Sequence, residues 1–127
     1  MLTDHADDIR PIALVGHRAC GKTTLTDALL HKSKAVDRFG SVDDGTSYSD
    51  YDDEEHLRKS SIDTSILHFE ANGKMIHLLA SPGAPDFAGA ALEALNAVET
   101  ALVVVSAVNG VEVNTRRMFN EAGKRDL

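Results

Sequence analysis

The sequence predicts an α/β fold with a mostly parallel sheet and one antiparallel hairpin strand. Short apolar runs alternate with helical patterns along the 127 residues, as a parallel sheet with crossover helices requires. The first run leads directly into a loop at residues 16–23. Asn72 and Gly73 separate two further runs and predict the hairpin, because a two-residue type I′ turn needs positive φ twice. Ligands of such sheets bind at the carboxyl ends of the strands, where the loop and the turn at residues 81–83 both lie.

The loop matches the phosphate-binding pattern G-x-x-x-x-G-K-[ST] in full. Its residues are Gly16, His17, Arg18, Ala19, Cys20, Gly21, Lys22 and Thr23. The glycines let the backbone curl so that its N–H groups point at a phosphate. Lys22 supplies a positive charge for the β- and γ-phosphates, and the Thr23 hydroxyl can bind Mg²⁺. The alternative, a glycine-rich turn that only caps a helix, is disfavoured by the elements on either side.

Those flanking elements have the periodicity that a phosphate-binding loop needs. Residues 11–16 form an apolar run without polar alternation, which predicts a strand buried on both faces. After the loop, Leu25, Ala28 and Leu29 recur at helical spacing, with Leu30 beside them.

Residues 37–60 contain few large apolar side chains. Their acidic residues include Asp43, Asp44, Asp50, Asp52, Asp53, Glu54 and Glu55. A carboxylate cluster can be a metal site, but no ligand spacing is evident, which favours a solvated, mobile loop. A loop of this length in a compact domain is usually functional or disordered.

Two strands are predicted around the Asn-Gly turn, at residues 65–70 and 75–80. Leu67 and Phe69 share one face of the first strand, and the second strand is mostly apolar. We interpret His77 as a core or edge histidine, because the histidines show no metal-ligand spacing.

The remaining residues predict a helix, a strand and a second helix. Residues 81–85 break the preceding strand, and Asp86 is the candidate N-cap of the next helix. The apolar residues of that helix are Phe87, Ala90, Ala91, Ala94, Leu95 and Val98. Residues 101–106 predict a third buried strand, and a last helix is expected over residues 114–122 with Gly123 as its C-cap.

Composition excludes several classes of function. The net charge of −7 argues against direct nucleic-acid binding by this segment. One cysteine excludes an internal disulfide framework and fits a reducing compartment. The acidic start at residues 1–8 has no apolar segment of a secretory signal, and no apolar run is long enough to cross a bilayer. We therefore expect one domain of a cytoplasmic protein without a membrane partner.

Four ordered motifs resemble those of translational GTPases. Residues 16–24 resemble the family's phosphate-binding motif, and residues 58–62 (Arg-Lys-Ser-Ser-Ile) resemble its switch I motif, usually Arg-Gly-Ile-Thr-Ile. Residues 80–87 (Ala-Ser-Pro-Gly-Ala-Pro-Asp-Phe) resemble the switch II signature Asp-Thr-Pro-Gly-His-x-Asp-Phe. Residues 103–112 resemble the strand and turn that follow. The resemblance covers residues 12–127 and is closest to the GTPase domain of elongation factor G, particularly its elongation-factor-G-like branch.

This resemblance implies a P-loop GTPase domain that binds GTP and GDP and acts on the ribosome. It adds Thr24 and Gly83 to the nucleotide-binding residues, with the Gly83 N–H on the γ-phosphate. Thr23 and Ser61 would bind Mg²⁺, and loss of the γ-phosphate would release both switch loops.

The chain ends before the Asn-Lys-x-Asp motif that reads guanine in the family, so residues 1–127 are expected to be the N-terminal part of an incomplete domain. Nothing in these residues selects guanine over adenine.

Two residues depart from the family's pattern. Ala80 stands where the family has an Mg²⁺-associated aspartate, so we expect weaker Mg²⁺ binding. Ala84 stands where the family has the histidine that positions the attacking water, so no residue is assigned as catalytic. Three hypotheses remain: a ribosome-dependent GTPase, a nucleotide-binding module with lost or very slow hydrolysis, and a half-domain that binds nothing tightly.

Overall fold

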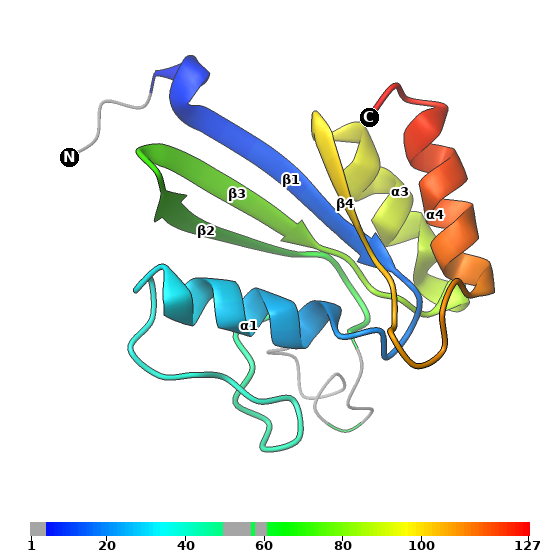
Figure 1. The fold of residues 1–127 in the computed structure, drawn as a ribbon, viewed down its shortest axis with the longest axis horizontal. Coiled ribbons are helices and arrows are strands. Elements are labelled where there is room, and N and C mark those ends of the chain that lie inside the picture. Colours follow the sequence, from blue (N-terminus) through cyan, green and yellow to red (C-terminus); the bar gives the residue numbers. More distant parts are fainter. Residues whose placement is uncertain (1–4, 50–56, 58–60) are drawn as a thin grey trace.

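The computed structural model describes residues 5–49, 57 and 61–127, and these form one sheet with helices on both faces (Figure 1). The strands are β1 (Ile9–Gly16), β2 (Ser65–Ala71), β3 (Lys74–Ala80) and β4 (Thr100–Val104), and the helices are α1 (Lys22–Lys32), α3 (Ala88–Asn96) and α4 (Val113–Gly123). The strand order is β2-β3-β1-β4. β1 is parallel to β3 and β4, and β2 is antiparallel to β3. The predicted α/β fold, mostly parallel with one antiparallel strand, is confirmed.

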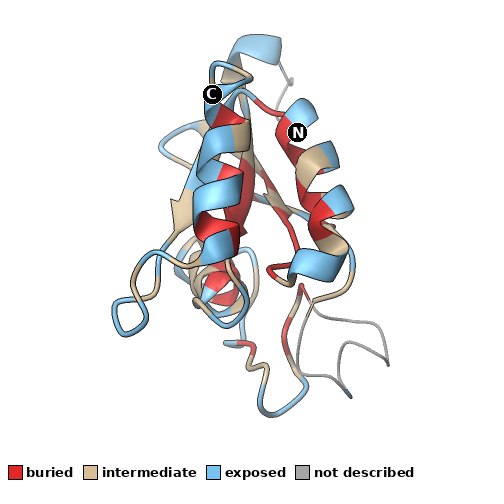
Figure 2. Cartoon of the chain, turned by 90° about the vertical axis from the view of Figure 1, so that its right-hand side faces the viewer, coloured by how far each residue is buried: buried red, intermediate tan, exposed pale blue. Residues whose placement is uncertain are grey.

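The central strand β1 is buried on both faces, as its unbroken apolar run predicts. Ala13, Leu14 and Val15 have no exposed surface. Ala13 and Val15 pack beneath α3 and α4, whose buried residues face the sheet in Figure 2. Leu14 points to the other face, where it packs with Leu30 of α1. Alternation along one strand therefore supplies both apolar layers.

β1 begins at Ile9, two residues earlier than predicted. Ile9 and Arg10 pair with β3, and the ladder continues through Pro11. Pairing with β4 starts only at Ile12. Pro11 thus lies where β1 has a neighbour on one side, which is where a sheet tolerates a residue without an N–H.

The hairpin forms as predicted. Asn72 and Gly73 have φ of 51° and 72°, the two left-handed conformations of a type I′ turn. His68 lies opposite His77 across the pair, with ring centroids 6.2 Å apart. Within the described ranges, no three His, Cys, Asp or Glu side chains come together to hold a metal ion.

The prediction that Asp86 caps the next helix is wrong. Pro85–Phe87 forms a 3₁₀ turn in which the Phe87 N–H bonds to the Ala84 carbonyl, and α3 starts at Ala88 with Phe87 as its N-cap. Proline at the first position of the turn initiates the turn before Asp86 can act as a cap. Val98 lies beyond the end of α3 at Asn96, although it is buried in the core.

The third strand forms, but it is shorter than predicted and none of its residues is fully buried. β4 ends at Val104, and β1 is its one partner among the residues that the structure describes. Leu102 and Val105 remain 42% and 45% exposed. An apolar run predicts burial but does not reveal how many neighbours a strand has.

The last helix extends through the residue predicted to end it. Gly123 is the final helical residue of α4, and Lys124 is the C-cap. The left-handed residue that follows is Asp126, with φ of 58°, and the Leu127 N–H returns to the Ala122 carbonyl. The reversal occurs three residues later than a glycine C-cap would place it.

The first part of the long loop lies against α1. Asp27 of α1 is fully buried, and its Oδ1 accepts the Tyr48 N–H at 3.0 Å. Gly40 lies close to the same carboxylate, since a β-carbon at residue 40 would be 3.0 Å from it. Of the acidic residues predicted for this loop, Asp43 and Asp44 are exposed. Asp50, Asp52, Asp53, Glu54 and Glu55 lie outside the described residues.

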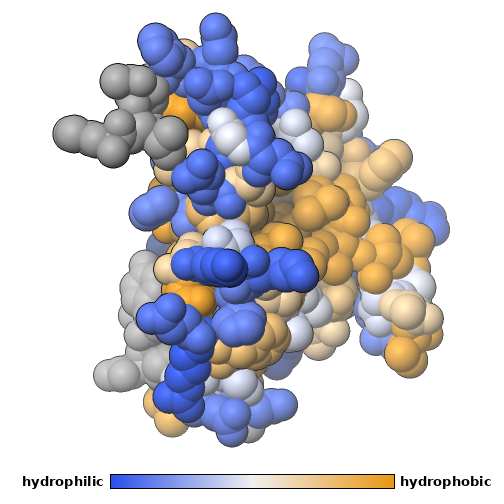
Figure 3. Space-filling view, turned by 60° about the vertical axis from the view of Figure 1, so that its left-hand side comes forward, coloured by the Kyte–Doolittle hydropathy of each residue, from blue (hydrophilic) through white to orange (hydrophobic). Residues whose placement is uncertain are grey.

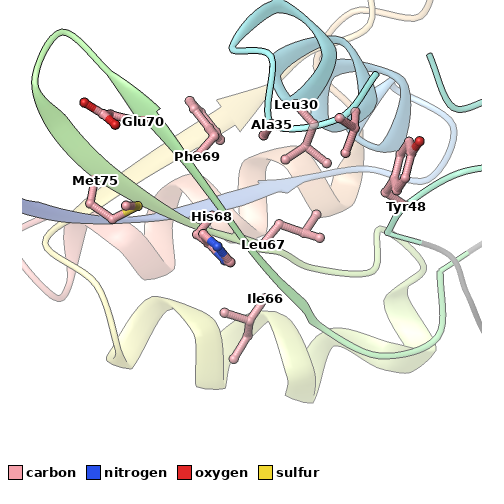
Figure 4. A pocket seen from close by; sticks show the side chains of 10 residues that line it. Leu30, Ala35, Tyr48, Ile66, Leu67, His68, Phe69, Glu70 and Met75 are labelled. Atoms are coloured by element: carbon pink, nitrogen blue, oxygen red, sulfur yellow. The ribbon is translucent and has the colours of Figure 1, made fainter. Parts of the chain in front are cut away.

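Apolar surface remains in several places. The face shown in Figure 3 carries an apolar area bordered by hydrophilic side chains. Between α1 and β2, Leu30, Tyr48, Leu67 and Phe69 contribute to an open pocket of about 480 Å³ (Figure 4). None of its lining residues belongs to the phosphate-binding loop.

No helix in the described part of the chain has the length and apolarity to cross a membrane.

Candidate nucleotide-binding site

The phosphate-binding loop connects β1 to α1 and has the backbone that its glycines predict. Gly16 and Gly21 adopt φ of 156° and 99°, and Ala19 between them adopts 56°. A β-carbon at Gly16 would lie 2.5 Å from the Val104 carbonyl of β4. At Gly21 no atom lies within 4 Å of such a carbon, so the left-handed backbone alone requires glycine. Ala19 and Gly21 have positive φ and Cys20 between them does not, an alternation that in general turns successive backbone N–H groups toward one side of a loop.

The Lys22 side chain lies inside the curled loop and bonds to its backbone. Lys22 is 7% exposed, and Nζ donates to the His17 carbonyl at 2.7 Å. The Cys20 sulfur lies 3.7 Å from the same nitrogen. The ammonium therefore lies inside the loop, beside the His17 carbonyl.

The side chain of His17 points away from the loop toward α4. Its Nδ1 accepts the Asn114 backbone N–H at 3.4 Å, and Nε2 lies 3.5 Å from Glu112 Oε1. Because Nδ1 accepts, the ring proton belongs on Nε2, facing the carboxylate. His17 thus presents its carbonyl to Lys22 and its ring to the start of α4.

The turn after β3 lies directly across from the loop. Ser81 is buried, and its hydroxyl donates to the Leu14 carbonyl at 2.8 Å. This bond fixes the turn to the end of β1. Gly83 follows so close to the loop that an added β-carbon would lie 2.3 Å from Lys22 Nζ and 2.6 Å from the His17 carbonyl oxygen. The fold therefore brings Gly83 and Lys22 together.

Asn114 of α4 connects the loop to this turn. It is 1% exposed, and Nδ2 donates to the Gly16 carbonyl at 3.2 Å and to the Gly83 carbonyl at 3.0 Å. A primary amide has two hydrogens, so one side chain satisfies both acceptors.

The two residues predicted to bind Mg²⁺ are also neighbours. Thr23 Oγ1 and Ser61 Oγ lie 3.4 Å apart, although 38 residues separate them in the chain. Two hydroxyl oxygens suit Mg²⁺, which prefers oxygen ligands. Ala80, at the end of β3, adds no carboxylate to this pair. Arg58, Lys59 and Ser60 of the predicted switch I motif lie outside the described residues.

The remaining residues of the predicted nucleotide site differ in solvent exposure. Arg18 and Ala19 are exposed, Thr24 is solvent-facing on the first turn of α1, and Cys20 is half-buried. Ala84, at the position of the family's histidine, is half-buried just before the 3₁₀ turn.

Sequence reasoning missed Asn114, although Glu112 ends one of the recognised motifs. Both Asn114 and Thr115 are polar residues at buried positions of a helix. A buried asparagine normally has a specific hydrogen-bond partner, so this pattern was the available signal. The partners themselves lie 31 and 98 residues earlier in the chain and have no local signature.

Comparison with known proteins places this chain in one family. The family model described as "Elongation factor Tu GTP binding domain" matches residues 7–127. "Ribosome-releasing factor 2, mitochondrial" of Drosophila willistoni is 36% identical over 123 residues, which is 97% of this chain and 17% of that protein. "Elongation factor G-like protein" of Mycobacterium tuberculosis is 34% identical over 116 residues, or 91% of this chain and 16% of that protein. The chain thus spans about a sixth of the length of these relatives.

Two solved structures share the fold of this chain. A crystal structure of a Thermus thermophilus protein superposes with a TM-score of 0.88 at 44% identity, covering 91% of this chain and 18% of that one. The bacterial selenocysteine-specific elongation factor matches with a TM-score of 0.69 at 22% identity, covering 88% of this chain and 17% of that one. At the lower identity the likeness shows the fold alone.

Proposed function

The chain belongs to the family of translational GTPases that carry the elongation factor Tu GTP-binding domain, and on that premise we propose that it binds GTP and GDP through residues 16–24. The proposal makes residues 1–127 the N-terminal part of a P-loop GTPase domain. The Gly83 N–H contacts the γ-phosphate, so loss of that phosphate releases the turn.

One observation carries this proposal. Gly83 lies within the space around Lys22 Nζ, where a side chain on residue 83 would collide. A γ-phosphate held by the Lys22 ammonium would therefore meet the turn at Gly83. Because Lys22 Nζ and Gly83 lie side by side, a γ-phosphate bound by Lys22 would also contact Gly83, and its loss would free the Gly83 turn.

Mg²⁺ in this proposal is held by the Thr23 and Ser61 hydroxyls. Their oxygens are neighbours, and both are of the hard type that Mg²⁺ prefers. When bound, the ion would neutralise charge on the phosphates. Ala80 leaves this donor set without a carboxylate, so the proposed affinity for Mg²⁺ is low.

A second candidate function is a nucleotide-binding module with lost or very slow hydrolysis. Ala80 and Ala84 favour it, because a methyl group can neither anchor Mg²⁺ nor position an attacking water. The loop that binds phosphate is unaffected by either residue. This candidate shares the nucleotide site and differs only in the chemical step.

For the whole protein we propose a role on the ribosome. Curated relatives of this chain are named a ribosome-releasing factor and an elongation-factor-G-like protein. The ribosome would then be the partner of a longer protein of which this domain is one part. The cytoplasmic location expected from the sequence stays a prediction, and one of these relatives is named mitochondrial.

Titration with fluorescent GTP and ATP analogues, with and without Mg²⁺, tests the binding proposal. We expect saturable binding of the GTP analogue that Mg²⁺ strengthens only modestly. Absence of a saturable signal with either analogue would contradict nucleotide binding by this chain. We expect the GTP and ATP analogues to bind with similar affinity, because nothing in residues 1–127 selects guanine over adenine.

Single-turnover hydrolysis by the full-length protein with ribosomes separates the two candidate functions. A measurable rate supports the GTPase, and a rate at the level of buffer supports the binding module. Ala84→His should raise the rate if the missing histidine limits the reaction, whereas Ala97→His, an exposed position after α3, should not. No gain from Ala84→His would count against the positioning argument.

A further inference from the structure

We propose that Asn114 is a positioning residue that couples the Gly83 turn to the phosphate-binding loop and thereby sets the preference for a nucleoside triphosphate over a diphosphate. This inference rests on the proposed contact between Gly83 and the γ-phosphate. Asn114 itself touches no nucleotide in this proposal and acts through Gly83.

The first step is the pair of hydrogen bonds from one amide group. Nδ2 of Asn114 donates to the carbonyls of Gly16 and Gly83, at 3.2 and 3.0 Å. The side chain is 1% exposed, so water does not compete for these bonds. The bridge joins the end of β1 to the turn after β3.

The second step is the attachment of Asn114 to the loop side of the bridge. Its backbone N–H donates to Nδ1 of His17, and His17 Nε2 lies beside Glu112. Further along α4, Met118 and Ala122 are buried in the core beneath the sheet. These contacts attach α4 to the loop, and the amide connects the Gly83 turn to both.

The hydrogen bond to Gly83 restrains the backbone at the proposed γ-phosphate contact. Its acceptor is the carbonyl of the residue whose N–H is proposed to contact the γ-phosphate. Holding that carbonyl limits the rotations of the Gly83 backbone and keeps it beside Lys22. The Gly83 backbone is therefore already in place when a triphosphate binds, so less conformational entropy is lost on binding. A diphosphate does not extend to Gly83 in the proposed arrangement, so its affinity does not depend on the bridge.

The chemistry of the amide also explains why an isosteric acid cannot replace it. Both hydrogens of Nδ2 are used, and Oδ1 has no hydrogen-bond partner within the described residues. An aspartate at position 114 would present only acceptors to two carbonyl oxygens, because an ionised carboxylate has no donor. Asn114→Asp thus removes the bridge at nearly constant shape, and Asn114→Ala removes it without adding charge.

The control is Asn120→Asp, at an exposed position of the same helix. For each variant, dissociation constants are measured for GDP and for a non-hydrolysable GTP analogue. We expect both Asn114 variants to weaken binding of the triphosphate analogue by about tenfold or more, with GDP within about twofold of the unsubstituted chain. Equal loss for both nucleotides, or no loss for either, would overturn the proposal.

A second measurement needs no nucleotide. Amide hydrogen exchange at residues 83, 84, 86 and 87 should be about tenfold faster in the Asn114 variants than in Asn120→Asp. Unchanged exchange would overturn the coupling. If the unsubstituted chain binds neither nucleotide while exchange still rises in the variants, the bridge stands and the proposed function fails.

Discussion

Gly83 faces the ammonium of Lys22 so closely that a β-carbon at residue 83 would lie 2.3 Å from Nζ and 2.6 Å from the His17 carbonyl oxygen. The lysine side chain can move aside, but the His17 carbonyl is part of the loop backbone and cannot move without distorting it. We therefore expect Gly83→Ala to cost about 1–3 kcal/mol of stability and to weaken nucleotide binding.

The matched control is Gly89→Ala in α3, where an added β-carbon would have no atom within 4 Å. This substitution should be neutral or stabilise the helix by up to about 1 kcal/mol. Urea denaturation and nucleotide titration measure both variants. Identical behaviour of the two would mean that the close approach at Gly83 is not rigid.

Lys22→Ala should abolish phosphate-dependent binding while the chain stays folded. The substitution removes the positive charge from the loop and one hydrogen bond to the His17 carbonyl, a stability loss of about 1 kcal/mol. Lys32→Ala, exposed at the end of α1, is the control and should bind normally. Circular dichroism reports the fold and fluorescence titration the binding. Unchanged affinity of Lys22→Ala would indicate that the loop binds no phosphate.

Asp27→Ala should loosen the described part of the long loop. Oδ1 accepts the Tyr48 N–H, and Oδ2 is buried without a hydrogen-bond partner within the described residues. Removing the carboxylate leaves the Tyr48 N–H unpaired in a partly buried place, a cost of about 1–3 kcal/mol. Hydrogen exchange at Tyr48 should rise, whereas Asp37→Ala, near the surface end of the same loop, should leave it unchanged. Slow exchange in Asp27→Ala would show that the loop is held by other contacts.

Leu78→Ala tests the core beneath α1. Leu78 is 1% exposed and packs in one cluster with Leu14, Leu30 and Phe69. We expect a loss of about 2–5 kcal/mol in the free energy of unfolding, because transfer and cavity terms add. Ile66→Ala, at a position 70% exposed, should stay within about 0.5 kcal/mol. Comparable losses of unfolding free energy in Leu78→Ala and Ile66→Ala would contradict the assignment of Leu78 to the core.

The pKa of Glu121 offers a test at low pH. Hydrogen bonds from Lys124 and then Arg125 lower the pKa of this carboxyl from its ordinary 4.5 to about 2. Because the folded-state pKa is depressed, the stabilisation is complete above pH 4.5 and is lost as the pH falls through about 2. An NMR titration of the carboxyl carbon measures the pKa directly. Lys124→Ala should raise it toward the ordinary value, and an unchanged pKa would assign the shift to Arg125.

Local features of the chain could be predicted because neighbouring residues determine them. The hairpin turn required positive φ at Asn72 and Gly73, and both have it. The burial of Ala13, Leu14 and Val15 followed from an apolar run without alternation. In contrast, Asp86 is a good N-cap by residue type, yet Pro85 starts a 3₁₀ turn first. Two local preferences competed there, and pattern alone does not decide between them.

The class of fold, the curled loop at residues 16–23 and the family were predictable from sequence, because each depends on short local patterns and on their order along the chain. The contacts of Asn114 with Gly16 and Gly83, which are 98 and 31 residues away from it, became visible only in the folded chain. The tertiary structure also decided that β1 is the one strand paired with β4 in the described part of the chain. Contacts of this kind depend on how helices pack on the sheet, so chain segments meet without any shared local pattern.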